Sequence, residues 1–229
     1  MPLQPRLLIF GYRFPMLNAE PPRVLLTGFE PFGGMETNPS GGVVLNAAQQ
    51  LTAQGIPTES VILPVTFSGA SERLKQAITA NNWDLVVCVG VAPGRTKVGI
   101  ERVAINVDDA RIADNGGASP IDEPIVAEGP AAYFATLSIK RAFAAVTGIG
   151  VPVEVSNTAG TYVCNHVFYE LMHALAGASG ARGGFVHIPL AEDLGEAESA
   201  RALVAIVEST FSEAASKASR DVPLAGTIS

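Results

Sequence analysis

The sequence contains only two cysteines, Cys88 and Cys164, and three histidines among 229 residues. Two cysteines are too few to cross-link a secreted domain of this size, so reduced thiols in a cytosol are the simpler interpretation. We therefore predict a cytoplasmic protein. The scarcity of histidine also limits any imidazole base to His166, His173 or His187.

Basic clusters and long apolar runs are missing as well. The formal net charge is -7, and no block of Lys or Arg occurs. This pattern excludes the basic surface of a protein that binds nucleic acid or an anionic membrane, and it disfavours a polyanionic substrate. No stretch is long enough to span a bilayer. Neither GxGxxG nor GxxxxGK[ST] occurs, so we expect no nucleotide site.

The first 22 residues lack the features of a folded element or a secretory signal. The apolar run Leu7 to Phe10 is shorter than a secretory core, and five prolines disfavour a helix or a central strand. We interpret residues 1–22 as a disordered or mis-assigned N-terminal extension, with a start at Met16 equally plausible. With 48% hydrophobic residues, the remainder can bury one large core, so residues 23–229 are expected to form a single domain.

From Arg23 onward, continuous apolar runs alternate with helical patterns, which is typical of strands covered on both faces by helices. The expected strands are 24–27, 60–65, 85–90, 103–107, 153–156 and 185–188. The expected helices are 39–51, 68–80, 130–146, 161–176 and 196–217. This alternation predicts an α/β fold with its ligand crevice at the carboxyl ends of strands. The polar segment from Asp108 to Glu128 is long enough to be either functional or mobile.

Cys164 is the candidate nucleophile. It falls in the first turn of the helix expected over 161–176, where free backbone amides and the helix dipole favour a thiolate. A free cysteine is more often a small packed hydrophobe, and this interpretation suits Cys88, which lies within an apolar strand.

A cysteine nucleophile needs an imidazole within hydrogen-bond reach. His166 is two positions from Cys164 on the same helix, and side chains so spaced do not face each other. His173 is nine positions on, about 13 Å along the axis. His187 remains, at the end of an apolar strand, although a strand-end histidine can also be bonded only to backbone.

Glu101 is the candidate for the residue that orients the base. If a strand begins at Glu101, alternation places this carboxylate on the same face as Val103, Ile105 and Val107. A carboxylate on an apolar face needs a partner, and an imidazolium would supply one. Glu101 could equally precede the strand and be solvated, and the residue pattern alone leaves both possibilities open.

Phe29 and Phe32 lie in a turn-rich segment after the first expected strand. They could cover the core, or they could form a slot for a flat apolar ligand.

Four blocks of this sequence resemble the pyroglutamyl peptidases of type I, also called pyrrolidone-carboxylate peptidases, which remove N-terminal pyroglutamate from peptides. The resemblance spans about Arg23 to Glu213. It rests on TGFEPFGG followed by Asn38-Pro39, on ERVAINVDDARIADN, on SNTAGTYVCNHVFYELMH and on GFVHIPL. Four ordered blocks are far more specific than one short motif.

The resemblance implies a role for each matching position. Cys164 would be the nucleophile, His187 its base and Glu101 the orienting acid, which decides between the two readings of Glu101. Arg111 would support the oxyanion. The substrate-binding positions would be Phe29, Phe32, Asn38, Val91 and Val163.

The resemblance also implies a three-layer α/β/α sandwich with an open, twisted, mostly parallel sheet. It implies a single catalytic domain over 23–229 that needs no metal or cofactor and assembles into a homo-oligomer, a dimer or a tetramer. The expected partners are peptides with N-terminal pyroglutamate, with no nucleic acid and no membrane.

One segment departs from the family pattern. Where the family has a glycine-glutamine-x-glycine-glycine-arginine run, this chain has Gly90-Val91-Ala92-Pro93-Gly94-Arg95. A contact through backbone would tolerate Val91, whereas a contact through a glutamine side chain would be lost. Two alternatives therefore stay open: an amidase or deamidase acting on another small cyclic or glutamine-like amide, and a catalytically silent pyroglutamyl-binding homologue.

Overall fold

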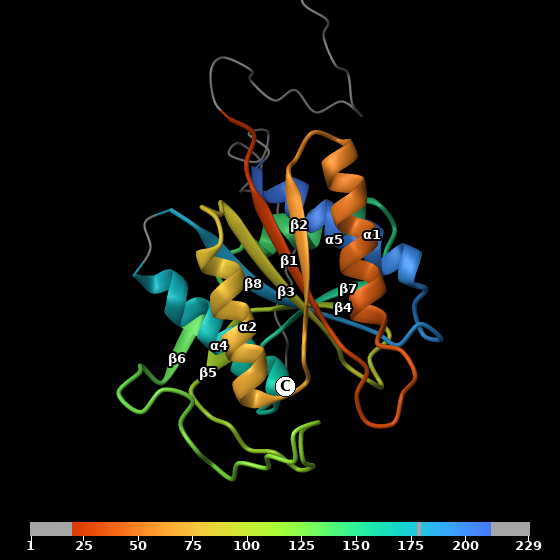
Figure 1. Cartoon of the computed structure of the whole chain (residues 1–229). Helices are drawn as coiled ribbons and strands as arrows, with labels where there is room; N and C mark the ends of the chain where they lie inside the picture. The colour runs from red at the N-terminus through yellow and green to blue at the C-terminus, as the bar shows by residue number, and fades with distance from the viewer. Residues whose placement is uncertain (1–19, 178–179, 212–229) are drawn as a thin grey trace, which may run out of the picture.

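The computed structural model describes residues 20–177 and 180–211, and its centre is a six-stranded sheet (Figure 1). The strands of this sheet are β1 (Val24–Phe29), β2 (Thr58–Leu63), β3 (Leu85–Val91), β4 (Val98–Glu101), β7 (Val153–Ser156) and β8 (Arg182–Ile188). Their order is β2-β1-β3-β8-β4-β7, and only the β8–β4 pairing in this sheet is antiparallel. The expected open, mostly parallel sheet is confirmed.

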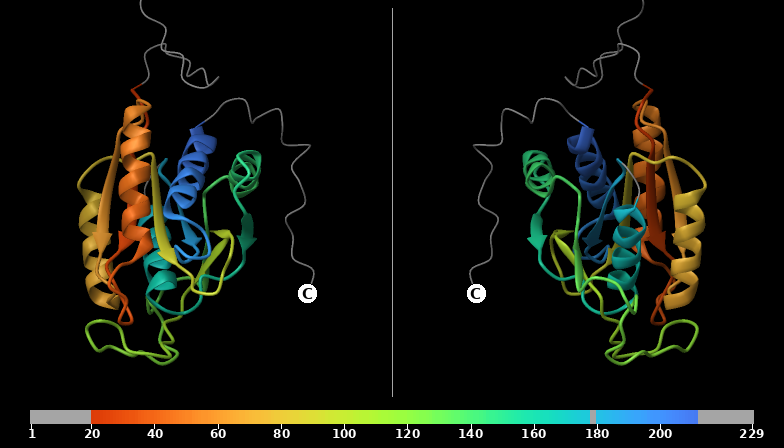
Figure 2. Two further views of the ribbon diagram at one scale, coloured as in Figure 1. Left: turned by 90° about the vertical axis from the view of Figure 1, so that its right-hand side faces the viewer. Right: turned by 90° about the vertical axis from the view of Figure 1, so that its left-hand side faces the viewer.

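Helices cover both faces of the sheet (Figure 2). On one face lie α1 (Pro39–Ala53), α3 (Ile139–Gly148) and α5 (Glu196–Phe211), and on the other lie α2 (Phe67–Thr79) and α4 (Val163–Ala176). The three-layer α/β/α arrangement is therefore confirmed. Among residues 20–177 and 180–211, no helix is both long and apolar enough to cross a membrane.

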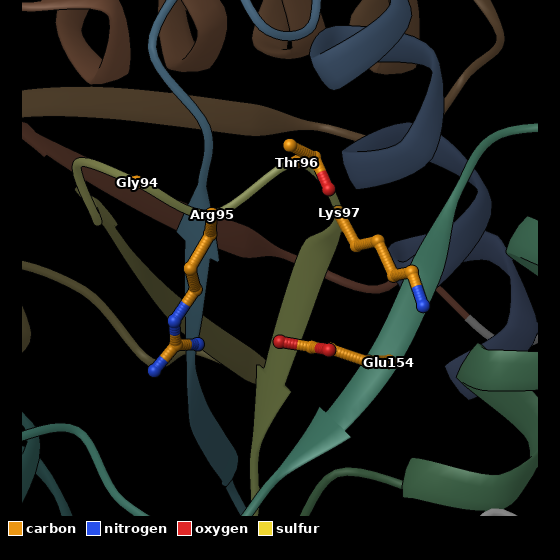
Figure 3. A pocket seen from close by; sticks show the side chains of 5 residues that line it. All are labelled: Gly94, Arg95, Thr96, Lys97 and Glu154. Atoms are coloured by element: carbon orange, nitrogen blue, oxygen red, sulfur yellow. The ribbon is translucent and has the colours of Figure 1, made fainter.

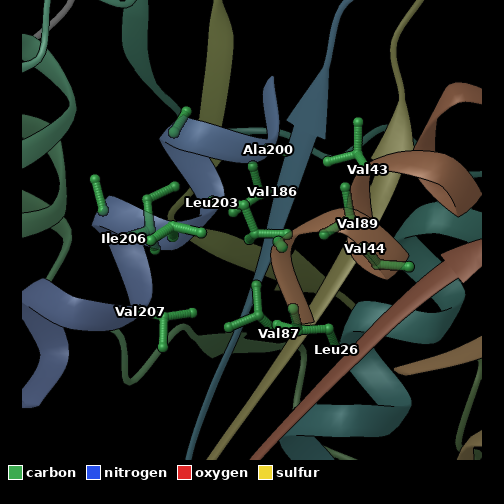
Figure 4. Packing of buried hydrophobic residues seen from close by; sticks show 14 of the residues in the cluster. Leu26, Val43, Val44, Val87, Val89, Val186, Ala200, Leu203, Ile206 and Val207 are labelled. Atoms are coloured by element: carbon green, nitrogen blue, oxygen red, sulfur yellow. The ribbon is translucent and has the colours of Figure 1, made fainter. Parts of the chain in front are cut away.

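Alternating residues of the central strands supply two separate cores. Val87, Val89 and Val186 pack with α1 and α5 on one face (Figure 4). Cys88 and Phe185 point to the opposite face and pack with α4. Because both faces are buried, these strands are continuously apolar, as the sequence indicated. The same alternation decides which strand residues face the candidate nucleophile.

The start of α1 is fastened to the end of β1 by close backbone approach. A Cβ atom on Gly28 would lie 2.6 Å from the carbonyl oxygen of Ser40, so only glycine fits there. Asn38 caps α1 by accepting a hydrogen bond from the Ser40 amide at 3.1 Å, and its Nδ2 donates to the Glu30 carbonyl at 2.9 Å. The loop that carries Phe32 is thereby held against α1.

The hypothesis that the strand expected over 103–107 begins at Glu101 is wrong. Glu101 instead ends β4, and the chain then enters β5 (Val103–Ile105), which belongs to a separate two-stranded sheet. Val103 and Ile105 are only partly buried, whereas Glu101 is fully buried. The carboxylate is buried because β4 lies between β8 and β7 in the main sheet, and not because it shares a face with Val103.

The helix expected over 130–146 is also wrong at its start. Residues Ala132–Phe134 form strand β6, which pairs antiparallel with β5, and α3 begins only at Ile139. Tyr133 packs against Tyr169 of α4 and its hydroxyl lies 2.8 Å from Nδ1 of His173. Strand pairing and this aromatic contact override the local helical pattern.

The other expected helices agree within a few residues. The last of them, predicted over 196–217, is observed over Glu196–Phe211, and residues 212–217 lie outside the described residues. Most of the expected N-terminal extension, residues 1–19, also lies outside them.

Candidate active site

Cys164 is the second residue of α4 and is partly exposed. Its sulfur lies directly above strand β3, because a Cβ atom on Gly90 would be 2.8 Å from Sγ. Gly90 therefore makes room for the thiol on the sheet. The same virtual atom would lie 3.0 Å from the Phe185 ring, so the thiol sits against the face formed by β3 and β8.

His187 lies beside this position. It is paired in register with Gly90 across the β3–β8 ladder, is 4% exposed, and its ring centroid is 4.8 Å from that of Phe185. Its Nδ1 lies 2.7 Å from Oε1 of Glu101. Because an ionised carboxylate can only accept, Nδ1 carries the proton and Nε2 is left to act as a base.

Glu101 reaches His187 because β4 runs antiparallel to β8. Gly99 is in register with His187, and Glu101 is two residues further on the same face of the strand. The Glu101 side chain is completely buried, and Oε1 also accepts a hydrogen bond from Nη1 of Arg95 at 2.9 Å. The structure thus brings Cys164, His187 and Glu101 together from three different elements.

The two other histidines bond elsewhere. His166 is buried, with Nε2 2.6 Å from Ser71 Oγ and Nδ1 2.7 Å from Asp108 Oδ2. This network joins α2, α4 and the start of the 108–128 segment. His173, in the last turn of α4, bonds to the hydroxyl of Tyr133.

The ionisation of Cys164 differs from the sequence-based expectation. Burial, the charge of Glu101 and the nearby Cys88, in that order of importance, together raise the pKa of its thiol to about 12, and Arg95 acts in the lowering direction. Desolvation, which disfavours the thiolate, therefore outweighs the stabilisation that the start of α4 would give it. The resting thiol is neutral at physiological pH, and its proton must leave as the sulfur attacks.

The two phenylalanines of the β1 loop have different settings. Phe29 ends β1 and is only 3% exposed, packed in the core beneath α2 and α4. Phe32 is partly exposed, and its ring centroid lies 5.3 Å from that of Tyr162. The Tyr162 ring also contacts Phe67 edge-on at 5.4 Å. Tyr162 thus joins an aromatic cluster two residues before Cys164, a position that the sequence reasoning did not single out.

Arg111 lies on the segment that adjoins the start of α4. Asp109 and Thr161 are joined by two hydrogen bonds, Asp109 N to Thr161 O at 2.9 Å and Thr161 Oγ1 to Asp109 O at 2.8 Å. Arg111 follows two residues later and is exposed. Val163 is 1% exposed, so its side chain is packed in the core and does not face a ligand.

Val91 points away from the thiol. Its side chain packs against the cluster beneath α1 and α5, whereas Gly90 faces Cys164. A contact between this position and a ligand at Cys164 would use the Val91 backbone.

Arg95 is the site residue that the sequence reasoning missed. It ends the Gly90 to Arg95 segment, in which the sequence pattern indicated only that Val91 replaces a glutamine. No local pattern indicates its contact with Glu101, because that contact depends on the turn over residues 92–95 and on the space over Gly99.

Comparisons with known proteins show the family of this chain. The family described as "Pyroglutamyl peptidase" matches residues 22–203. A pyrrolidone-carboxylate peptidase of Clavibacter michiganensis is 49% identical over 202 residues, which cover 84% of this chain and 94% of that protein. One from Streptomyces coelicolor is 52% identical over 172 residues, covering 75% and 79%.

Solved structures give the same result. Pyroglutamyl peptidase I of Bacillus amyloliquefaciens superposes with a TM-score of 0.77 at 39% identity, covering 82% of this chain and 96% of that one. A mutant pyrrolidone carboxyl peptidase from Pyrococcus furiosus has a TM-score of 0.77 at 35% identity, covering 82% and 98%. The chain therefore belongs to the pyroglutamyl peptidase family of cysteine peptidases.

Proposed function

We propose that this chain releases N-terminal pyroglutamate from peptides, with Cys164 as nucleophile, His187 as base and Glu101 as the acid that orients it. The observation that carries the assignment is the shared position of these groups on one face of the sheet. Cys164 Sγ lies over Gly90, Gly90 is paired with His187, and His187 Nδ1 is 2.7 Å from Glu101 Oε1. A nucleophile, a base and an orienting acid are what acyl transfer requires.

In the first step, Cys164 Sγ attacks the carbonyl carbon that follows the pyroglutamyl ring. Because burial keeps the thiol neutral, His187 Nε2 takes its proton during the attack. The imidazolium formed is stabilised by Glu101 Oε1. The negative oxygen of the tetrahedral intermediate faces the free amides at the start of α4, with Arg111 as a further donor, each worth about 3–4 kcal/mol in comparable sites.

In the second step, the intermediate collapses and the C–N bond breaks. His187 returns its proton to the leaving amine, and a thioester joins the pyroglutamyl group to Cys164. Water then attacks the thioester while His187 takes a proton from it. The thiol is restored as free pyroglutamate leaves.

Recognition of the ring must rely on shape and on one donor and one acceptor, since pyroglutamate carries no ammonium group. The aromatic cluster around Phe32 and Tyr162 supplies flat apolar surface next to Cys164. We propose that Phe32, with Phe29 beneath it, contacts the ring. Asn38 would hold the loop through Glu30, and Val91 and Val163 would contribute backbone groups only.

A panel of fluorogenic amides separates this function from another amidase activity. We expect hydrolysis of the pyroglutamyl amide and about a hundredfold or greater preference over the prolyl amide, which lacks the lactam carbonyl. The glutaminyl amide, which carries a charged amine, should also be a poor substrate. Preference for the glutaminyl amide would instead favour an amidase that acts on a glutamine-like substrate.

Thiol alkylation separates an enzyme from a silent binding homologue. Iodoacetamide should abolish activity with a stoichiometry of one per chain, at Cys164, and 2-pyrrolidone should slow the loss. A protein that binds 2-pyrrolidone but releases no amine before alkylation would be a silent homologue.

We further propose that the enzyme is a cytoplasmic homo-oligomer that acts through a single catalytic domain over 23–229. Large apolar side chains remain exposed on one chain, including Phe134 of β6 at 70% and Ile121 at 76%, which supports assembly. Light scattering coupled to size-exclusion chromatography would give a mass above 23.8 kDa, and a monomeric mass would contradict the assembly.

A further inference from the structure

Arg95 makes a contact that the three-residue mechanism does not use. Its Nη1 donates to Oε1 of Glu101 at 2.9 Å, the same oxygen that bonds to His187. Its other terminal nitrogen, Nη2, lies 3.3 Å from the Thr158 carbonyl and 3.4 Å from Ser156 Oγ. The guanidinium therefore links the buried carboxylate to the end of β7 and to the segment after it, which leads into α4.

A tight turn returns Arg95 over the sheet. After β3, the Arg95 amide donates to the Ala92 carbonyl at 3.2 Å, and Gly94 has a φ of 83°. Proline at the second position and a positive-φ glycine at the third are the pattern of a type II turn. Pro93, which stands where the family has a glycine, and Gly94 thus reverse the chain and place Arg95 near β4.

Gly99 leaves the space that Arg95 needs. A Cβ atom on Gly99 would lie 2.5 Å from Nη1 of Arg95 and 3.6 Å from Oε1 of Glu101. Gly99 lies within β4 in register with His187. The guanidinium occupies the space that a side chain at Gly99 would fill, so a Cβ atom there would force Nη1 of Arg95 to move.

We propose that Arg95 is a positioning residue of the catalytic site, which uses the space over Gly99 to hold Glu101 ionised and aimed at His187. This inference rests on the proposed roles of Cys164, His187 and Glu101. Glu101 is fully buried, and a buried carboxylate without a cation would pay a large desolvation cost or take up a proton. A protonated Glu101 would lose the charge that stabilises the imidazolium.

Arg95 also acts on the nucleophile. The groups that bear on the Cys164 thiol include Glu101 and Cys88, which raise its pKa, and Arg95, which lowers it. The Tyr162 phenol beside it is neutral, since its own pKa is raised to about 12 by burial and by Asp114 and Cys164. Loss of Arg95 from this position therefore makes the thiol harder to deprotonate.

Two variants remove the contact in different ways. Arg95→Gln deletes the charge, whereas Gly99→Ala keeps the arginine and blocks its approach to Glu101. Lys97→Gln is the matched control, because Lys97 is exposed, lines the same surface hollow, and in Figure 3 points away from Arg95. Arg95→Lys restores the charge without the forked geometry.

We expect both Arg95→Gln and Gly99→Ala to lower kcat by about a hundredfold with little change in KM, because a misplaced base acts on the chemical step. Without substrate, iodoacetamide should alkylate Cys164 several-fold more slowly than in the wild type at each pH between about 7 and 9. Lys97→Gln should have the kcat and the alkylation rate of the wild type. Arg95→Lys should have values between those of the wild type and of Arg95→Gln.

Arg95 is also open to chemical rescue. Its side chain is 26% exposed and borders a hollow of about 300 Å³ formed with Gly94, Thr96, Lys97 and Glu154 (Figure 3). Millimolar guanidinium chloride should restore part of the activity of Arg95→Ala, and sodium chloride at equal ionic strength should not. Guanidinium chloride should not restore the activity of Gly99→Ala, because the new methyl group fills the space beside Glu101 that a guanidinium would need.

The inference is overturned if Gly99→Ala and Arg95→Lys, both folded by circular dichroism, keep wild-type kcat and wild-type alkylation rates. If Arg95→Gln does not fold, these two variants still decide the question. Alkylation needs no peptide substrate, so its result stands apart from the proposed function. A Cys164→Ala variant that still releases amine would refute the proposed function whatever Arg95 does.

Discussion

At the scale of single residues, burial decides how this site works. Cys164 lies at a helix start, yet its thiol pKa is raised to about 12, mainly by desolvation. A neutral nucleophile depends on its base more strongly than a preformed thiolate would. His187 must therefore be correctly oriented at the moment of attack, and Glu101 is the residue placed to do this.

Replacing Glu101 by Gln should lower kcat by about 10³–10⁴-fold, because the amide can keep the geometry but cannot stabilise the imidazolium by charge. KM should change little. Steady-state kinetics with a pyroglutamyl amide would measure both. Glu154→Gln, on the adjacent strand β7 and partly exposed, is the control and should retain activity. Equal activity of the two variants would remove Glu101 from the mechanism.

The buried thiol of Cys88 should affect the stability of the protein at high pH. It is fully buried, and burial raises its pKa from 9.0 to about 12. Above pH 9 the unfolded chain loses this proton while the folded chain keeps it, so the free energy of unfolding falls by about 1.4 kcal/mol per pH unit up to about pH 12. The free energy of unfolding of Cys88→Ala should fall less steeply with pH, by that amount per pH unit. Urea unfolding at pH 8 to 10.5 would show it, and parallel slopes would contradict it.

At the scale of elements, the 108–128 segment is attached at several points. The Asp108–His166–Ser71 network fixes its start to α4 and α2. Asp114 is buried, and its Oδ2 accepts a hydrogen bond from the Phe67 amide in the first turn of α2 at 2.9 Å. In Figure 1 the segment, in green, lies below the lower ends of α2 and α4. Its anchoring therefore supports the loop that carries Arg111.

Asp114→Asn should destabilise the protein by about 1–3 kcal/mol, because an amide group cannot accept all three backbone hydrogen bonds that Asp114 now accepts. Cleavage by protease within 108–128 should become faster. Asp122→Asn changes the same charge at an exposed position of the same segment and is the control. The loop account fails if both variants unfold at the same denaturant concentration.

At the scale of the whole molecule, the α/β/α fold could be predicted because its central strands are continuously apolar, and the continuity reflects burial on both faces. The positions of Cys164 and His187 follow from a helix start and a strand end, which are local patterns. Strand β4 was missed because four residues carry little periodicity, and its antiparallel pairing with β8 is a long-range feature.

Arg95 could not be predicted from local patterns for a related reason. Its contact depends on a turn at Pro93-Gly94 and on empty space over Gly99, and neither feature signals an ion pair in the sequence. Side chains that meet across strands far apart in the chain become visible only in the folded structure. The same holds for Gly90, whose missing side chain accommodates the thiol.

The most direct test compares the two cysteines of the chain. Cys164→Ala and Cys88→Ala each remove one thiol, and both should keep the far-ultraviolet circular dichroism of the wild type. With a fluorogenic pyroglutamyl amide, Cys88→Ala should release amine at close to the wild-type rate, whereas Cys164→Ala should be reduced by on the order of 10⁵-fold or more. Substantial activity in Cys164→Ala would contradict the assignment of Cys164 as the nucleophile.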